Sequence, residues 1–192
     1  MDEAKKLARR NITAFSDSPF PILTSCASCY THLRSYPDLL ADDPAWAERA
    51  EDFAKRVCEF SSFFLSRIDQ LSFSHTPSSP RIFYHDPCHL RFGLQKILTA
   101  PRRLITIASG SSPLELPHGP QCCGHGGLFS LAQPNLSQQI LDPLLDEVSE
   151  LSALQVVTTC SGCLMQLMRG TGKKASSIRV EHLSILLNRF LE

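Results

Sequence analysis

Five cysteines between residues 88 and 163 are the residues best suited to do chemistry. Cys88 stands alone, Cys122 and Cys123 are adjacent, and Cys160 and Cys163 form a CxxC pair. A thiolate is a soft ligand that suits iron and zinc, so several thiols converging on one point predict a metal site, with a disulfide framework as the alternative. Tetrahedral zinc takes only four ligands, one fewer than this set offers.

The residues around these cysteines carry a family resemblance. They form the segments Tyr-His-Asp-Pro-Cys88, Cys122-Cys123-Gly-His-Gly-Gly and Thr-Cys160-Ser-Gly-Cys163. Their order over residues 80–192 resembles the CCG-type cysteine-rich domain. That domain is found in heterodisulfide reductase and in the iron-sulfur subunits of glycolate oxidase, anaerobic glycerol-3-phosphate dehydrogenase and lactate-utilisation systems. The flanking residues that also fit are His85, Asp86, Pro87, His89, Gly124, Gly126 and Gly127.

The resemblance implies a cofactor and its ligands. In that family the five cysteines of a complete motif hold an iron-sulfur cluster, which is of the non-cubane 4Fe-4S type in heterodisulfide reductase. Carried over to this sequence, the residues that bind the cofactor and its metal are Cys88, Cys122, Cys123, Cys160 and Cys163. Thiolate-bound zinc and a catalytic dithiol are the alternatives that the residues leave open.

Strands and loops must bring these cysteines together. Residues 81–84 and 154–158 are predicted strands that end just before Cys88 and Cys160, and ligands gather at the carboxyl ends of parallel strands. We predict an α/β fold with a small parallel sheet and flanking helices, containing one complete cysteine-rich repeat and the C-terminal part of a homologous repeat. Three glycines after the adjacent cysteines allow the positive φ and sharp bend that both thiols need to face one cluster: Gly124, Gly126 and Gly127.

The periodicity of apolar residues predicts the other elements. Helices are expected over 3–15, 137–151, 160–168 and 182–191, with a short helix ending near residue 40 and one or two helical pieces over 89–108. Short strands are expected over 20–24, 114–116 and 177–180. An apolar stripe predicts one long helix that starts at Asp42-Asp43-Pro44 and carries Trp46, Ala50, Phe53, Val57, Phe60 and Phe64.

The first part of the chain repeats the end of the second part. The shift that superposes Cys26 on Cys160 also superposes Cys29 on Cys163, and an internal duplication explains the match. We expect the C-terminal portion of a first cysteine-rich repeat at 1–73, a linker at 74–80 and a complete CCG domain at 80–192. Cys26 and Cys29 then cannot complete a five-thiolate site within this chain.

Composition narrows the class of protein. The chain is 43% hydrophobic, and its 19 basic residues balance 19 acidic ones, so no net charge draws it to nucleic acid or to an anionic membrane. No apolar run has the length of a membrane span, and the start of the chain has no secretory signal. We expect a cytoplasmic protein, with any membrane association made through a partner, and cysteines kept as ligands or reactive thiols.

The sequence contains no dinucleotide fingerprint and no Walker loop, so a flavin or nicotinamide must be bound by another subunit. The resemblance implies an electron-transfer subunit of a flavin-dependent glycolate or lactate dehydrogenase. Its partners would be a flavoprotein dehydrogenase subunit and a ferredoxin-like iron-sulfur segment, and its electrons would pass to a quinone or another carrier. The alternatives are a heterodisulfide-reductase-like subunit that acts on a disulfide and a zinc-stabilised interaction module.

Several polar residues near the cysteines receive weaker predictions. Asp86 is expected to cap the helix after Pro87. Each of three histidines could be a donor to the cluster, a proton carrier or a structural hydrogen-bonding group: His85, His89 and His125. Three arginines could offset the cluster charge, form a docking surface or lie on a solvated face: Arg91, Arg102 and Arg103.

Overall fold

The computed structural model describes residues 2–74, 81–174 and 176–192, so residues 75–80 of the expected linker lie outside this description. Its first part contains, in chain order, α1 (Asp2–Ala14), β1 (Ile22–Thr24), α2 (Ala27–Arg34), α3 (Tyr36–Leu39), α4 (Ala47–Arg56), β2 (Val57–Glu59), α5 (Phe60–Leu65) and the 3-10 helix η1 (Ile68–Gln70). Its second part contains β3 (Ile82–His85), α6 (Cys88–Phe92), α7 (Thr99–Ser109), α8 (Phe129–Ala132), α9 (Pro134–Glu150), β4 (Gln155–Thr158), α10 (Ser161–Lys173), β5 (Arg179–His182) and α11 (Leu183–Phe190).

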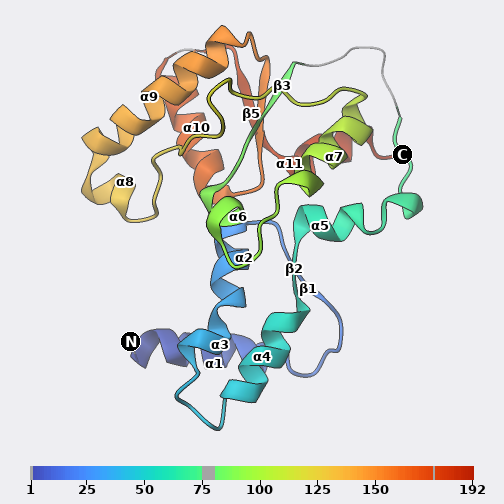
Figure 1. Ribbon diagram of the computed structural model, residues 1–192, viewed down its shortest axis with the longest axis vertical. Helices are drawn as coiled ribbons and strands as arrows, with labels where there is room; N and C mark the ends of the chain where they lie inside the picture. Colours follow the sequence, from blue (N-terminus) through green and yellow to red (C-terminus); the bar gives the residue numbers. More distant parts are fainter. Residues whose placement is uncertain (1, 75–80, 175) are drawn as a thin grey trace.

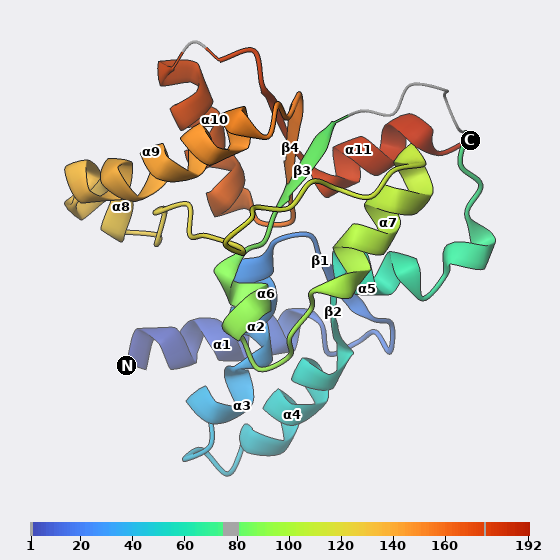
Figure 2. The ribbon, with the colours of Figure 1, turned by 45° about the horizontal axis from the view of Figure 1, so that its top comes forward.

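Short parallel strands lie between layers of helices, as the predicted α/β fold class requires. Strands β3, β4 and β5 form one parallel sheet with β4 in the middle, and β1 pairs in parallel with β2. Figure 1 shows α1, α3 and α4 at one end of the molecule and the larger sheet with its helices at the other, while α2 and α6 meet between them. Figure 2 gives the same arrangement from a second direction.

The larger sheet is buried on both faces. Phe83 and Val156 point into a core that includes residues of α1, α2, α4, α9 and α10. Tyr84 and Val157 point to the opposite face, where α5, α7 and α11 cover them. Every residue of β3 and β4 is buried, which is typical of strands in a parallel sheet with helices on both sides. Both cores join residues from before and after 75–80, so the two parts of the chain pack against one another.

The two parts of the chain share a similar order of elements, although α3 and α4 stand between α2 and β2 without counterparts in the second part. Strand β1, helix α2, strand β2 and helix α5 correspond to β4, α10, β5 and α11, and in each set the two strands are parallel neighbours. The residue before the last helix caps it in both sets: Glu59 accepts a hydrogen bond from the Ser62 amide, and His182 accepts one from the Ser184 amide. The division into 1–73, 74–80 and 80–192 stays a prediction.

The prediction of one long helix from residue 44 to residue 64 is wrong. Residues 57–59 form β2 between α4 and α5, because they pair with β1 and because Glu59 starts a new helix at Phe60. Ala50 and Phe53 are buried as the apolar stripe requires. Periodicity identified the buried positions, but it could not reveal a strand partner that lies far away in the sequence.

Two smaller differences concern the segments around the cysteines. The strand expected at 114–116 is a single bridge between Leu114 and Phe83. Helix α10 continues to Lys173, beyond the expected end at residue 168. Among the residues that the structure describes, no helix has the length and apolar character to cross a membrane.

Candidate metal centre

Six cysteines line one open pocket of about 670 Å³ at the carboxyl ends of the strands. Cys26 follows β1, Cys88 follows β3 and Cys160 follows β4, so the parallel strands deliver their cysteines to the same edge of the molecule. The loop between α7 and α8 and the first turn of α10 supply the others. The six cysteines are Cys26, Cys88, Cys122, Cys123, Cys160 and Cys163.

The five cysteines singled out from the sequence form a continuous series of side-chain contacts. Cys88 interacts with Cys122, which interacts with Cys123. Cys123 in turn contacts Cys163, and Cys163 contacts Cys160. The series runs from the half-buried Cys88 and exposed Cys122 to three buried thiols, so one side of the pocket is open to solvent and the other is closed by protein.

Interactions between neighbouring thiols lower the pKa of some of these cysteines and raise the pKa of others. Cys122 accepts hydrogen bonds from Cys123 and Cys88, which lower the pKa of Cys122 to about 2. The pKa of Cys160 lies far below that of a free thiol, mainly because Cys163 hydrogen-bonds to it. The hydrogen bond to Cys122 raises the pKa of Cys123 to about 11. The lowered pKa values of Cys122 and Cys160 favour the thiolate, which is the form of cysteine that binds metal.

The loop after Cys123 depends on glycine. Gly124 has a φ of 75°, and a Cβ atom placed there would lie 2.6 Å from the Ser137 carbonyl oxygen. The Gly124 amide donates to the Cys122 sulfur at 3.3 Å, and the Ser137 hydroxyl donates to the Gly124 carbonyl at 2.8 Å. The sharp turn therefore fixes the Cys122 sulfur while α9 holds the turn in place. Amide hydrogen bonds to sulfur also tune the reduction potential of iron-sulfur sites.

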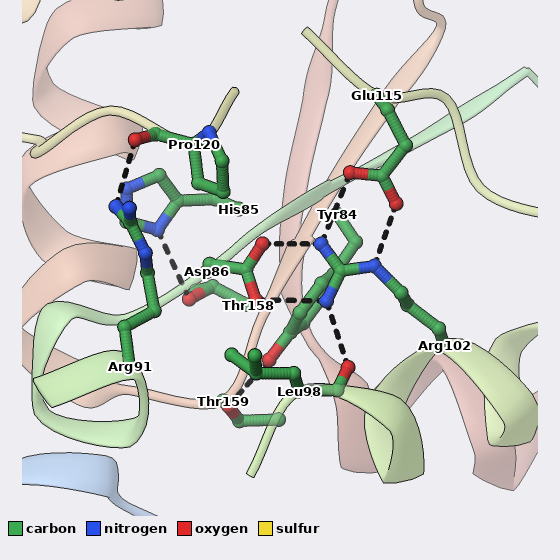
Figure 3. A network of polar contacts seen from close by, with 10 residues as sticks. All are labelled: Tyr84, His85, Asp86, Arg91, Leu98, Arg102, Glu115, Pro120, Thr158 and Thr159. Carbon is green, nitrogen blue, oxygen red and sulfur yellow. Dashed lines mark hydrogen bonds and ion pairs between the residues drawn. The ribbon is translucent and has the colours of Figure 1, made fainter. Parts of the chain in front are cut away.

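An arginine joins the turn that carries Cys88 to the loop that precedes Cys122. The Arg91 guanidinium on α6 donates to the Pro120 carbonyl at 2.7 Å, as Figure 3 shows. Pro120 lies two residues before Cys122. This contact explains how two cysteines on different loops come together, so Arg91 is a structural residue here.

Asp86 does not cap α6, contrary to the prediction. The cap position of α6 is Pro87, which makes no side-chain cap bond, and the buried Asp86 carboxylate pairs with both terminal nitrogens of Arg102. Arg102 also donates to the Glu115 carboxylate and to the Leu98 carbonyl (Figure 3). The ion pair occupies Asp86 and anchors the segment before Cys88 to α7, so neither group is free to serve as a ligand.

His85 is the histidine in closest relation to the thiols. A nitrogen of its buried ring and the sulfurs of Cys123 and Cys163 all lie within 4.8 Å of one another. Its Nδ1 lies 3.5 Å from the Thr158 hydroxyl, whereas Nε2 has no hydrogen-bond partner among the described residues. Burial lowers the pKa of His85, which favours the neutral imidazole. His85 thus lies behind the sulfurs of Cys123 and Cys163, whereas the histidines that line the pocket itself are His32, His89 and His125.

The other two predicted histidines, His89 and His125, line the pocket itself. His89 Nδ1 is 3.8 Å from the Cys88 sulfur. The His125 ring packs on Gly162, where an added Cβ would lie 2.6 Å from the ring. Their expected roles as donors or proton carriers stay predictions.

The donor set fits an iron-sulfur group. All the cysteines of the chain, which lie within the described residues, are free thiols, and soft sulfur ligands suit iron in clusters. A ring nitrogen of His85 lies beside two of these sulfurs, those of Cys123 and Cys163. The residues that would hold the group are Cys88, Cys122, Cys123, Cys160 and Cys163.

Sequence reasoning did not place any residue of the first part of the chain in the pocket. Cys26 and His32, both from the first repeat, line it together with the five cysteines of the second repeat. Cys29 is exposed and does not line the pocket. Cys58, on β2, is half-buried and donates to the Arg56 carbonyl at 3.5 Å. The repeat itself was a usable signal, because it equates Cys26 with Cys160 and places both directly after a strand.

Comparison with known proteins agrees with this geometry. The cysteine-rich domain family CCG matches residues 1–34 and 82–168. Lactate utilization protein A of Bacillus subtilis is 32% identical over 191 residues, which cover 97% of this chain and 77% of that protein. Lactate utilization protein A of Geobacillus thermodenitrificans is 30% identical over 190 residues, with 97% and 77% covered. The probable glycolate oxidase iron-sulfur subunit of Bacillus subtilis is 33% identical over 187 residues, which cover 95% of this chain but 42% of that protein.

Proposed function

The chain belongs to the CCG cysteine-rich domain family, and from that premise we propose that it is an iron-sulfur electron-transfer subunit of a flavin-dependent glycolate or lactate dehydrogenase. The observation that carries the proposal is the meeting of five thiols from separate loops in one pocket. Two relatives are named a lactate utilization protein and a probable glycolate oxidase iron-sulfur subunit, and both names support the same class of reaction.

The proposed cofactor is a 4Fe-4S cluster, which could be non-cubane, held by Cys88, Cys122, Cys123, Cys160 and Cys163. A bound cluster would accept and release single electrons. Around it, the Gly124 amide donates to the Cys122 sulfur. Protein encloses the sulfurs of Cys123, Cys160 and Cys163. Both features tune a reduction potential, because hydrogen bonds stabilise charge on sulfur and burial opposes added charge.

The proposed partners are a flavoprotein dehydrogenase subunit and a ferredoxin-like iron-sulfur segment. Electrons would leave the flavin of the partner, pass through this chain and continue to a quinone or another carrier. The proposed location is the cytoplasm, because a set of free thiols persists in a reducing compartment. Any association with a membrane would then be made through a partner.

The experiment is anaerobic reconstitution of the full chain with iron and sulfide, followed by metal analysis and visible absorption spectroscopy. We expect bound iron and sulfide with a broad visible absorption. We also expect Cys123→Ser to lose most of the iron and Cys58→Ser to keep it, since Cys123 lies in the pocket and Cys58 is bonded to the backbone elsewhere. Zinc without iron would contradict the proposal and support the zinc-stabilised module, and equal iron in both variants would contradict the ligand assignment.

The open pocket favours one further candidate, a heterodisulfide-reductase-like reaction. Small-molecule sites measure roughly 300–1,000 Å³, and the pocket of about 670 Å³ lies in this range. Three histidines line it beside the sulfurs: His32, His89 and His125. Reduction of a disulfide consumes two electrons and two protons and releases two thiols. Thiol release from a small disulfide by the chemically reduced, iron-loaded chain would support this candidate, and no release above that of the metal-free chain would exclude it.

A further inference from the structure

Cys26 comes from the first part of the chain but lies in the pocket that the five later cysteines line. Its sulfur is 3.2 Å from the Ser28 hydroxyl, which in turn is 3.8 Å from the Cys160 sulfur. The side chains of Cys26 and Cys160 also contact each other directly. Cys26 thus extends the series of contacting thiols by one sulfur, beyond Cys160.

Backbone contacts on both sides hold Cys26 in this place. The Ala27 amide donates to the Thr159 carbonyl at 2.9 Å, and the His182 ring nitrogen Nε2 lies 2.7 Å from the Ser25 carbonyl. The neighbours of Cys26 are therefore bonded to residues adjacent to β4 and at the end of β5. One main-chain hydrogen bond and one contact from the His182 ring thus hold the segment around Cys26 beside Cys160.

Cys26 and Cys160 also present their sulfurs from the same local structure. Each is the residue before a helix, with φ and ψ of −119° and 120° at Cys26 and −137° and 123° at Cys160. A thiol in either position projects from the end of a strand beside the first turn of a helix. Cys29, three residues further along α2, is exposed and outside the pocket, which makes it a matched control.

We propose that Cys26 is a sixth thiol of the metal site, a reserve ligand that binds metal in place of Cys160 when the Cys160 thiolate is absent. The proposal rests on the proposed function, because it assumes metal bound by the pocket. In the exchange, the Cys26 sulfur forms a bond to the metal and its proton passes to solvent. Soft thiolate ligation is retained, and Ser28, bonded to both sulfurs, positions the incoming thiol.

The first test needs no metal. The metal-free full chain is treated with diamide, which takes up two electrons and two protons as two thiols become a disulfide, and the cross-linked peptides are identified by mass spectrometry. We expect a disulfide between Cys26 and Cys160 in preference to any that contains Cys29. A Cys29 disulfide as abundant as the Cys26–Cys160 disulfide would contradict the placement of Cys26.

The second test measures iron retained against a chelator in three variants: Cys160→Ser, Cys26→Ser/Cys160→Ser and Cys29→Ser/Cys160→Ser. We expect Cys160→Ser to keep part of its iron and the Cys29 double variant to match it. The Cys26 double variant should retain iron about tenfold less well or worse, at least the effect of losing an outer-shell partner of a metal site. Equal retention in the two double variants would overturn the proposal.

The two proposals fail in different ways. A wild-type chain that binds no iron would refute the proposed function, while the diamide experiment would still report on the contact between Cys26 and Cys160. An iron-loaded wild type with equal double variants would leave the proposed function intact and refute the reserve ligand alone.

Discussion

The two CxxC pairs of this chain share their local structure but not their surroundings. Both follow a parallel strand and open a helix. Cys160 and Cys163 are buried with exposed fractions of 3% and 6%, whereas Cys26 is half-buried and Cys29 is exposed. The Cys-Cys-Gly loop and the turn after β3 cover the second pair. The CxxC spacing therefore places both pairs between a strand and a helix, but the segments packed against each pair decide whether its thiols can form a site.

The strands behind the two pairs show the same contrast. In β4 every residue is buried, because β3 and β5 flank it and α7 covers one face. Among the described residues β1 pairs only with β2, and Leu23 is 42% exposed while Val157, its counterpart, is completely buried. The second repeat thus supplies both the thiols and the rigid support of the candidate site.

The largest effect should come from substituting corresponding cysteines of the two pairs. Cys163→Ser is expected to remove most of the iron bound after reconstitution, because Cys163 contacts both Cys123 and Cys160 inside the pocket. Cys29→Ser is expected to leave the iron content unchanged. Iron and sulfide per chain are measured by chemical analysis. Similar iron losses in both variants would show that the two CxxC pairs contribute alike to metal binding.

A smaller effect, on the free energy of unfolding, is expected when one ion pair is broken in each part of the chain. Arg102→Ala leaves the Asp86 carboxylate buried without its partner, at a cost to the free energy of unfolding of about 3–5 kcal/mol. Lys5→Ala breaks a pair whose carboxylate, on Asp42, is 74% exposed, and we expect little or no loss because water and salt screen such a pair. Urea denaturation measures both values. Equal losses would mean that Asp86 gains little from its pairing with Arg102.

The smallest effect is expected when one apolar side chain is truncated in β4 and its counterpart is truncated in β1. Val157→Ala removes two fully buried methyl groups from β4, and the lost burial together with the remaining cavity should lower the free energy of unfolding by about 2 kcal/mol. Leu23→Ala, at a half-exposed position of β1, should cost about 1 kcal/mol or less, because much of its side chain already contacts water. If Leu23→Ala proves to be the more costly change, the contrast between the supports of β1 and β4 is wrong.

The sequence predicted much of this arrangement because the relevant signals are local. Strand ends immediately before Cys88 and Cys160 and the glycines after Cys123 follow from neighbouring residues. The repeat was also readable, since equal spacing at Cys26 and Cys160 needs only the sequence. The family resemblance followed from the same motif, and the comparisons confirm it. The roles of the five cysteines as ligands stay predictions that metal analysis can test.

Tertiary structure alone decided three features. Residues 57–59 became a strand because β1 lies beside them, and Asp86 became half of an ion pair because α7 places Arg102 opposite it. Cys26 joined the pocket because the Thr159 carbonyl and the His182 ring hold its two neighbours, Ala27 and Ser25. Propensity and periodicity depend on residues within a few positions, whereas these contacts join segments far apart along the chain, and only packing of the whole molecule brings them together.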